Sequence, residues 1–241
     1  MSVETHPLSI HGLLYNKINL FRSTVSTEIS VRYIDTVIEE AMQIVYEICV
    51  DNADINHRVI EDLRPLIVDA KSLTVLKQDS DYTIYQLPVG YFRNKRLYGK
   101  ITKPGCPQRN LRLWKAKANM INNLLRDKNW NPSYQWGVTF YDAVDNGVKV
   151  FHNGQFNIDD IKMDFYKKFT PLRCPAAEDE NFYTWYEGTK IATNQETEFL
   201  GNYLPRRITD VASAIIQRDR GDSNNFSMRL QAIMSFENLY K

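Results

Sequence analysis

The sequence predicts an α+β fold in which helices near both ends of the chain form a bundle, with an antiparallel β-rich portion inserted between them. Apolar residues recur at steps of three and four near both ends, which is the helical period. Between these regions, short runs rich in β-branched and aromatic residues alternate with turn signals. We therefore expect residues 1–65 and 196–241 to form the helical part. Residues 66–195 would form the inserted part, which includes a basic loop and a short helix.

The stretch from Glu28 to Val50 is predicted as an amphipathic helix, because its apolar residues share one helical face. These residues are Val31, Ile34, Ile38, Ala41, Met42, Val45 and Cys49. Asp54 is a suitable cap for a second, shorter helix. Pro65 ends that helix, since the residue before a proline disfavours the helical conformation.

Strand-like runs follow at 66–68, 73–76 and 82–85. Residues 95–108 contain several Lys and Arg together with glycine and proline, which indicates a basic loop. A short helix is expected next from the spacing of Trp114, Ala118, Ile121 and Leu125.

The clearest β pattern is the alternation of apolar residues from Tyr134 to Phe140, followed by Asn146-Gly147 as a hairpin turn. A further strand is expected around Ile161–Phe165. Near the C-terminal end, Pro205 suits a first helical turn. The apolar stripes that continue this helical region are Ile208, Val211, Ala212 and Ile215, then Phe226, Leu230, Ile233 and Met234.

The net charge of +1 hides a strong asymmetry along the chain. Residues 1–81 hold 7 basic and 13 acidic residues, and residues 127–241 hold 13 and 16. The 45 residues of 82–126 hold 10 basic residues and no Asp or Glu, although 24% of the chain is charged. This segment is therefore a candidate electrostatic surface.

No pattern of catalytic or cofactor-binding residues is visible, so we expect a protein that is not an enzyme and has no cofactor or metal. Phosphate-binding glycine motifs and a serine nucleophile elbow are absent from the sequence. Cys49, Cys106 and Cys174 are widely spaced and odd in number, which favours a protein folded in a reducing cytoplasm. No apolar run reaches the roughly 20 residues of a membrane span.

The basic segment allows three interpretations: a solvated surface, a docking surface for an acidic neighbouring subunit, and a nucleic-acid contact. Its cations alternate with aromatic residues, which stack on bases, while Lys and Arg release counterions from phosphates. The candidate residues are Arg93, Lys95, Arg96, Lys100, Lys103, Arg109 and Arg112. A further alternative is a metal-dependent nuclease that uses Asp159, Asp160 and Glu178.

The succession of elements resembles the neck ring, or adaptor, proteins of tailed bacteriophages, particularly those of crAss-like podoviruses. The segments that carry this resemblance are 62–66 (DLRPL), 85–92 (YQLPVGYF), 161–171 (IKMDFYKKFTP) and 207–212 (RITDVA). The resemblance is one of overall pattern, and it covers most of the chain. It implies a virion structural protein, made in the bacterial host cytoplasm, that joins the portal to the tail and lines the DNA passage.

The same resemblance implies the partners of the chain. They are the portal protein, neighbouring copies in a ring of twelve, and other tail or neck proteins. The chain would also make non-specific contact with packaged DNA, and no membrane is expected as a partner. The C-terminal segment from about Asn224 would contact the portal through apolar anchors. These candidates are Phe226, Met228, Leu230, Ile233, Met234 and Phe236. Another tail or capsid structural protein is an alternative that the sequence leaves open.

Overall fold

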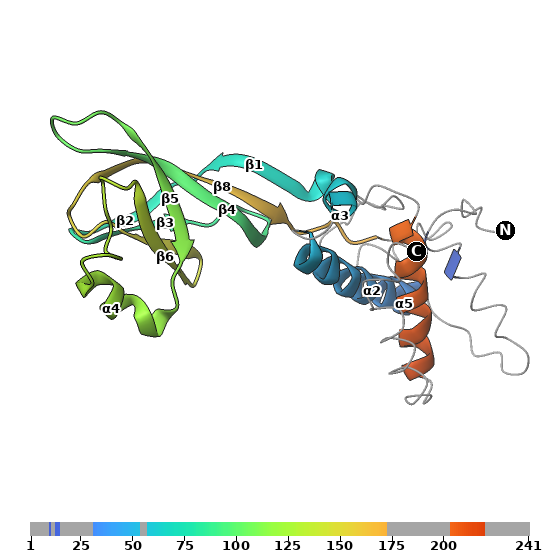
Figure 1. The fold of residues 1–241 in the computed structure, drawn as a ribbon. Helices are drawn as coiled ribbons and strands as arrows, with labels where there is room; N and C mark the ends of the chain where they lie inside the picture. Colours follow the sequence, from blue (N-terminus) through green and yellow to red (C-terminus); the bar gives the residue numbers. More distant parts are fainter. Residues whose placement is uncertain (1–9, 11–12, 15–30, 54–56, 173–202, 220–241) are drawn as a thin grey trace, which may run out of the picture. The chain divides into compact units, whose positions relative to one another are not determined.

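The computed structural model describes residues 10, 13–14, 31–53, 57–172 and 203–219 (Figure 1). The chain divides into two compact units. Residues 67–168 form a sheet unit, and residues 1–66 together with 169–241 form a helical unit.

The helical unit contains α2 (Val31–Asn52), α3 (His57–Asp62), the 3-10 turn η1 (Arg64–Leu66) and α5 (Tyr203–Asp219). The apolar stripe predicted for the first helix is confirmed, because its members from Ile34 to Cys49 are buried. The stripe of α5 is likewise buried, and α2 and α5 pack against each other. None of the described helices is both long and apolar enough to cross a membrane.

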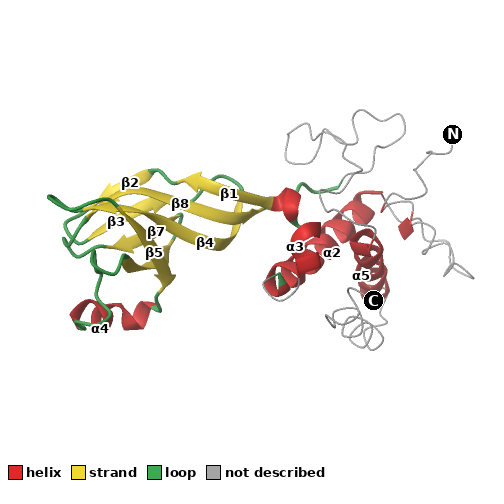
Figure 2. Cartoon of the chain, turned by 45° about the horizontal axis from the view of Figure 1, so that its top comes forward, coloured by secondary structure: helices red, strands yellow, loops and turns green. Residues whose placement is uncertain are grey.

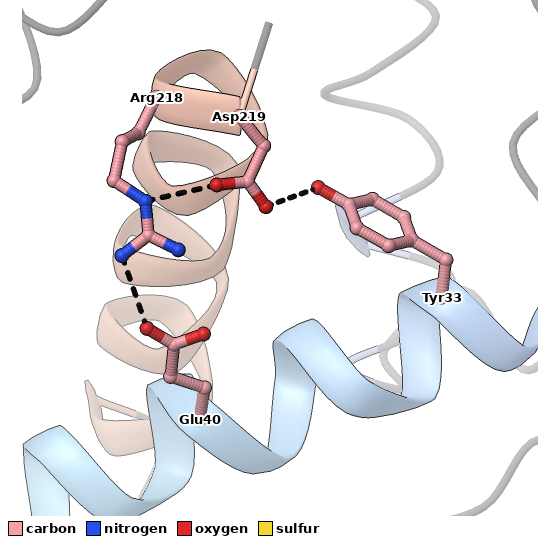
Figure 3. A network of polar contacts seen from close by, with 4 residues as sticks. All are labelled: Tyr33, Glu40, Arg218 and Asp219. Atoms are coloured by element: carbon pink, nitrogen blue, oxygen red, sulfur yellow. Dashed lines mark hydrogen bonds and ion pairs between the residues drawn. The ribbon is translucent and has the colours of Figure 1, made fainter.

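A polar network joins α2 to the end of α5 (Figure 3). The Arg218 guanidinium lies 3.2 Å from the Glu40 carboxylate and 2.9 Å from that of Asp219. The Tyr33 hydroxyl donates a hydrogen bond to the other carboxylate oxygen of Asp219 at 2.7 Å. This hydrogen bond, followed by that from Arg218, lowers the pKa of Asp219. Since such partly exposed ion pairs each contribute at most about 1 kcal/mol, the network orients α5 on α2 more than it stabilises the pair.

The sheet unit is an eight-stranded sheet with the order β1-β8-β4-β5-β6-β7-β3-β2 (Figure 2). Its strands are β1 (Ile67–Ser72), β2 (Val75–Gln78), β3 (Tyr82–Gln86), β4 (Tyr91–Thr102), β5 (Arg109–Lys115), β6 (Val138–Val144), β7 (Gly147–Phe151) and β8 (Asn157–Lys167). The longest pairing joins β4 to β8, from Tyr91↔Lys167 to Thr102↔Asn157.

The sheet is curled into a half-barrel, and its strand order explains why. The two edge strands, β1 and β2, are consecutive in the chain, and only Leu73 and Thr74 separate them. The Leu73 amide donates to the Ile161 carbonyl of β8, and the Thr74 carbonyl accepts from the Gln86 amide of β3. The two edges are therefore brought together by a two-residue connection, and Leu73 is buried in the core between them.

All neighbouring strands are antiparallel except β5 and β6, which pair in parallel from Arg112↔Val138 to Lys115↔Tyr141. A parallel pair needs a crossover connection. Residues 116–137 provide it, with the 3-10 turn η2 (Ala118–Met120) and α4 (Ile121–Arg126). Gly137 ends the crossover at φ +59°, and a Cβ atom there would lie 2.4 Å from the Asn110 carbonyl oxygen. Glycine is thus required where the crossover returns to β5.

Apolar side chains form a cluster on each face of the curled sheet. The inner face holds the larger core, made of Leu73, Tyr85, Leu97, Ile101, Leu111, Tyr141, Val148, Val150, Phe156, Ile161, Met163 and Phe165. On the outer face, Phe140 and Phe151 pack with Ala116 and with Leu124 of α4. The two aromatic rings lie 5.0 Å apart, and Trp114 lies 5.5 Å from Phe140. The crossover therefore covers part of the outer face.

The predicted fold class is wrong. The sheet is mixed rather than antiparallel, and it dominates the described structure. The described helices are α2, the short α3 and α4, and α5, with no terminal bundle. An apolar stripe shows that a helix is amphipathic, but it does not show how many helices pack together. The parallel pair was missed because it depends on how residues 116–137 cross over.

Two local predictions also need correction. The segment expected to be a basic loop, 95–108, is mostly strand, and only residues 103–108 connect β4 to β5. Trp114 belongs to β5 rather than to the short helix, which begins after it. The strands alternate between inward and outward residues, with Leu97, Ile101 and Leu111 buried and Trp114 on the same face as Phe140. The many cations obscured this period of two.

His152, after β7, is a buried titratable residue of the sheet unit. The imidazole is buried, and its Nδ1 accepts a hydrogen bond from the Gly154 backbone N–H. Its Nε2 lies 3.3 Å from the Thr83 hydroxyl oxygen. Burial lowers its pKa, with Asp81 acting in the opposite direction. A histidine that is held neutral stabilises the fold above its ordinary pKa near 6.5, and this contribution is lost as the pH falls through the lower folded pKa.

We therefore expect the free energy of unfolding to decrease as the pH is lowered below about 6.5. Urea denaturation of the wild type and of His152→Gln across this range measures the effect. The variant should show a flatter pH dependence. Parallel curves for the two proteins would contradict the role assigned to His152.

Candidate interface on the basic hairpin

The sequence-predicted basic residues lie on the β4–β5 hairpin. All seven cations are exposed, whereas Leu97, Gly99, Ile101 and Leu111 between them are buried. In the paired part, Leu97, Gly99 and Ile101 face inward, so Arg96, Tyr98 and Lys100 face outward. Arg112 is paired with Tyr98 and shares its face. The strand geometry therefore places Arg96, Lys100 and Arg112 on the outer face, where Asp164 and Asp160 of β8 lie opposite Arg96 and Lys100.

Three of the predicted cations, Lys95, Arg96 and Arg112, line a single open cavity of about 640 Å³. Its other lining residues are Asn94, Leu97, Tyr98, Gly99, Asn110, Leu111, Leu113 and Tyr141. None of these residues carries a carboxylate. The cavity is thus polar and positively charged, and it has the size of a typical ligand pocket.

The other four cations are distributed around this cavity. Arg93 lines a second cavity of about 440 Å³ with Lys115 and Asp145. Arg109 stacks over Tyr134 and donates to the Gln135 carbonyl oxygen at 2.6 Å. Lys100 lies opposite Asp160 of β8, and Lys103 is on the connection between the strands. The seven residues therefore share the hairpin but do not converge on one point.

Asn94 and Tyr141 lie at both cavities, and sequence reasoning missed both residues. The Asn94 side-chain amide donates to the Tyr141 hydroxyl at 2.8 Å. Burial raises the pKa of Tyr141, so this phenol stays protonated. The Asn94 Oδ1 atom is buried and has no hydrogen-bond partner within the described part of the chain. No local signal predicts this pair, because the two residues come from β4 and β6.

Two of the three carboxylates of the nuclease hypothesis, Asp159 and Asp160, lie in the described part of the chain and contact other side chains. Asp159 accepts hydrogen bonds from Thr102 at 2.7 Å and from Gln108 at 2.8 Å. Its neighbour Asp160 lies 3.8 Å from Lys162. Glu178 lies outside the described residues. Among residues 57–172 and the other described ranges, no cluster of three His, Cys, Asp or Glu residues is placed to hold a metal ion.

The six apolar portal-contact candidates, Phe226 to Phe236, also lie outside the described residues. Within the sheet unit, Trp136 is a large apolar side chain that is 76% exposed. It follows Gln135, whose carbonyl accepts the Arg109 guanidinium. An exposed aromatic side chain therefore follows, in sequence, a residue that contacts the hairpin.

No protein-family model matches this chain, and no curated protein matches it.

Proposed function

We propose that this chain is a non-enzymatic structural subunit of a virion, a neck ring adaptor that joins the portal of a tailed bacteriophage to its tail. The phage assignment comes from the resemblance of the sequence to neck ring proteins. The helical bundle which that resemblance implied is absent from the described residues. Support for an assembling subunit therefore rests on the distribution of charge.

The single observation that carries the proposal is the opposite charge of the two units. The sheet unit, residues 67–168, contains 17 Lys and Arg, nine Asp and no Glu, a net charge of +8. The remainder of the chain contains 13 basic and 20 acidic residues, a net charge of −7. When each copy binds the next through two different surfaces, repeated contacts form a closed ring if the rotation from copy to copy adds up to a full turn. Opposite potentials steer such contacts and exclude wrong pairings.

In this arrangement, the cationic hairpin of one copy docks on the acidic helical unit of the next. Lys95, Arg96, Lys100 and Arg112 supply exposed charges, with Asp164 and Asp160 of β8 opposite Arg96 and Lys100. Electron microscopy of the protein mixed with the portal protein from the same virus tests the proposal. An added ring of density on the portal supports it.

A second candidate function is binding of nucleic acid by the same hairpin. The exposed Trp136, which follows the Arg109-bound Gln135 in sequence, favours it, because proteins bind single strands by stacking bases on aromatic rings and by placing cations along the phosphate backbone. Nucleic-acid binding and the connector role are compatible if the hairpin faces the DNA passage. They differ in that nucleic-acid binding needs no second copy of the chain.

A further inference from the structure

The cavity lined by Lys95, Arg96 and Arg112 is a gap in the sheet. β4 pairs with β5 only over Tyr98–Ile101, although both strands continue beyond this pairing (Figure 1). Toward the start of β4 and the end of β5, the two strands separate. The sheet is otherwise continuous, so this gap is an interruption between two of its central strands.

A bulge in β4 explains the separation. Asn94 is paired with Phe165 and Arg96 with Asp164, so Lys95 is an extra residue without a partner position on β8. Such a bulge bends its strand and increases the local twist. β4 follows β8 through the bulge, while β5 follows β6 in parallel. The two strands are therefore directed apart by their other neighbours.

The gap leaves strand edges without a partner strand. Residues 94–97 of β4 pair with β8 on one side, and residues 113–115 of β5 pair with β6 on one side. On the facing sides, no described strand pairs with either segment. Backbone N–H and C=O groups at such edges are ready to pair with an added strand.

The polar and charged groups of the cavity indicate which side chains an added peptide strand would carry. The exposed Lys95, Arg96 and Arg112 attract negative groups, with Arg96 also opposite Asp164 of β8, and arginine forms bidentate hydrogen bonds with carboxylates. Asn94 Oδ1 is a buried acceptor without a donor among the described residues, while the same amide donates to the Tyr141 hydroxyl. A phosphate group would supply negative charge but no pattern of alternating donors and acceptors. A peptide with acidic side chains supplies both.

We propose that this gap binds an extended acidic peptide segment of a partner chain as an added β-strand. Its backbone pairs with the open edges of β4 and β5, and its Asp or Glu side chains meet Arg96 and Arg112. Side chains at alternate positions of a strand share one face, so the preferred segment has acidic residues two positions apart. The inference deepens the proposed function and rests on it for the identity of the partner as a neighbouring subunit.

The test uses the full chain and two labelled synthetic peptides. One peptide alternates Asp with Val, and the other replaces each Asp by Asn. Fluorescence anisotropy should show the acidic peptide binding about ten-fold or more tightly than the neutral peptide. The double variant Arg96→Gln/Arg112→Gln should lose about ten-fold or more of this affinity. The matched control Lys117→Gln/Lys128→Gln, which removes two exposed cations outside the cavity, should bind like the wild type.

Amide hydrogen exchange separates strand addition from simple charge attraction. On peptide binding, amides in residues 94–97 and 113–115 should become protected. Absence of binding, equal binding of both peptides, an equal loss in the control variant or binding without protection would each overturn the inference. Displacement of the peptide by inorganic phosphate at similar concentration would also overturn it, by identifying a plain anion site. Circular dichroism checks that the variants are folded. Since peptide binding and ring formation on a portal are measured separately, either can fail while the other succeeds.

Discussion

Simultaneous replacement of Arg93, Lys95 and Arg96 by glutamate is expected to abolish assembly of the protein into rings. The change lowers the net charge of the sheet unit from +8 to +2 and places three carboxylates at the start of the cationic hairpin. A contact that depends on opposite potentials then meets like charge, which costs several kcal/mol. Sedimentation velocity should show assemblies for the wild type and a single small species for the variant.

Ionic strength and a matched variant make this experiment specific. Raising the salt from about 0.1 M to about 1 M shortens the Debye length from about 10 Å to about 3 Å, so wild-type assemblies should dissociate. Reversal of Lys117, Arg126 and Lys128 to glutamate changes the net charge equally but lies outside the hairpin. This control should still assemble. Unimpaired assembly of the hairpin variant, or equal loss in the control, would show that the hairpin is not the docking surface.

Truncation of Phe140 to alanine is expected to cause the largest loss of stability in the sheet unit. Phe140 is fully buried and packs between Phe151 and Trp114 on the outer face. Removal of a buried aromatic ring lowers the free energy of unfolding by about 3–5 kcal/mol, from lost apolar burial and from the cavity left behind. A loss of this size is a large part of the total stability of a domain.

Urea denaturation monitored by circular dichroism measures this loss. Trp136→Ala is the control, since a side chain that is 76% exposed should change the free energy of unfolding by less than about 0.5 kcal/mol. A loss below about 1 kcal/mol for Phe140→Ala would mean that the crossover with α4 does not form a tightly packed second core.

Local features of this fold were accessible from the sequence where one residue pattern decides the structure. The stripe from Ile34 to Cys49 identified α2, and the Asn146-Gly147 turn correctly separated β6 from β7. Features that depend on distant parts of the chain were not accessible. The curl of the sheet depends on Leu73 and Thr74 joining its two edges. The parallel pair depends on the return of the crossover at Gly137.

The candidate site shows the same division. The cations of the hairpin were identified from charge alone, because a long segment without Asp or Glu can be read directly from the sequence. The gap between β4 and β5 was not, because the Lys95 bulge is defined only by its pairing with β8. Asn94 and Tyr141 meet across 47 positions of sequence, and neither is unusual in its local context.

The most direct test of the connector function is cryo-electron microscopy of the purified protein mixed with the portal protein from the same virus. The proposal predicts an additional ring at one end of the portal, with the hairpin of each copy against the helical unit of its neighbour. A portal without added density, together with salt-sensitive binding of this protein to DNA as a single copy, would contradict the connector function and favour nucleic-acid binding.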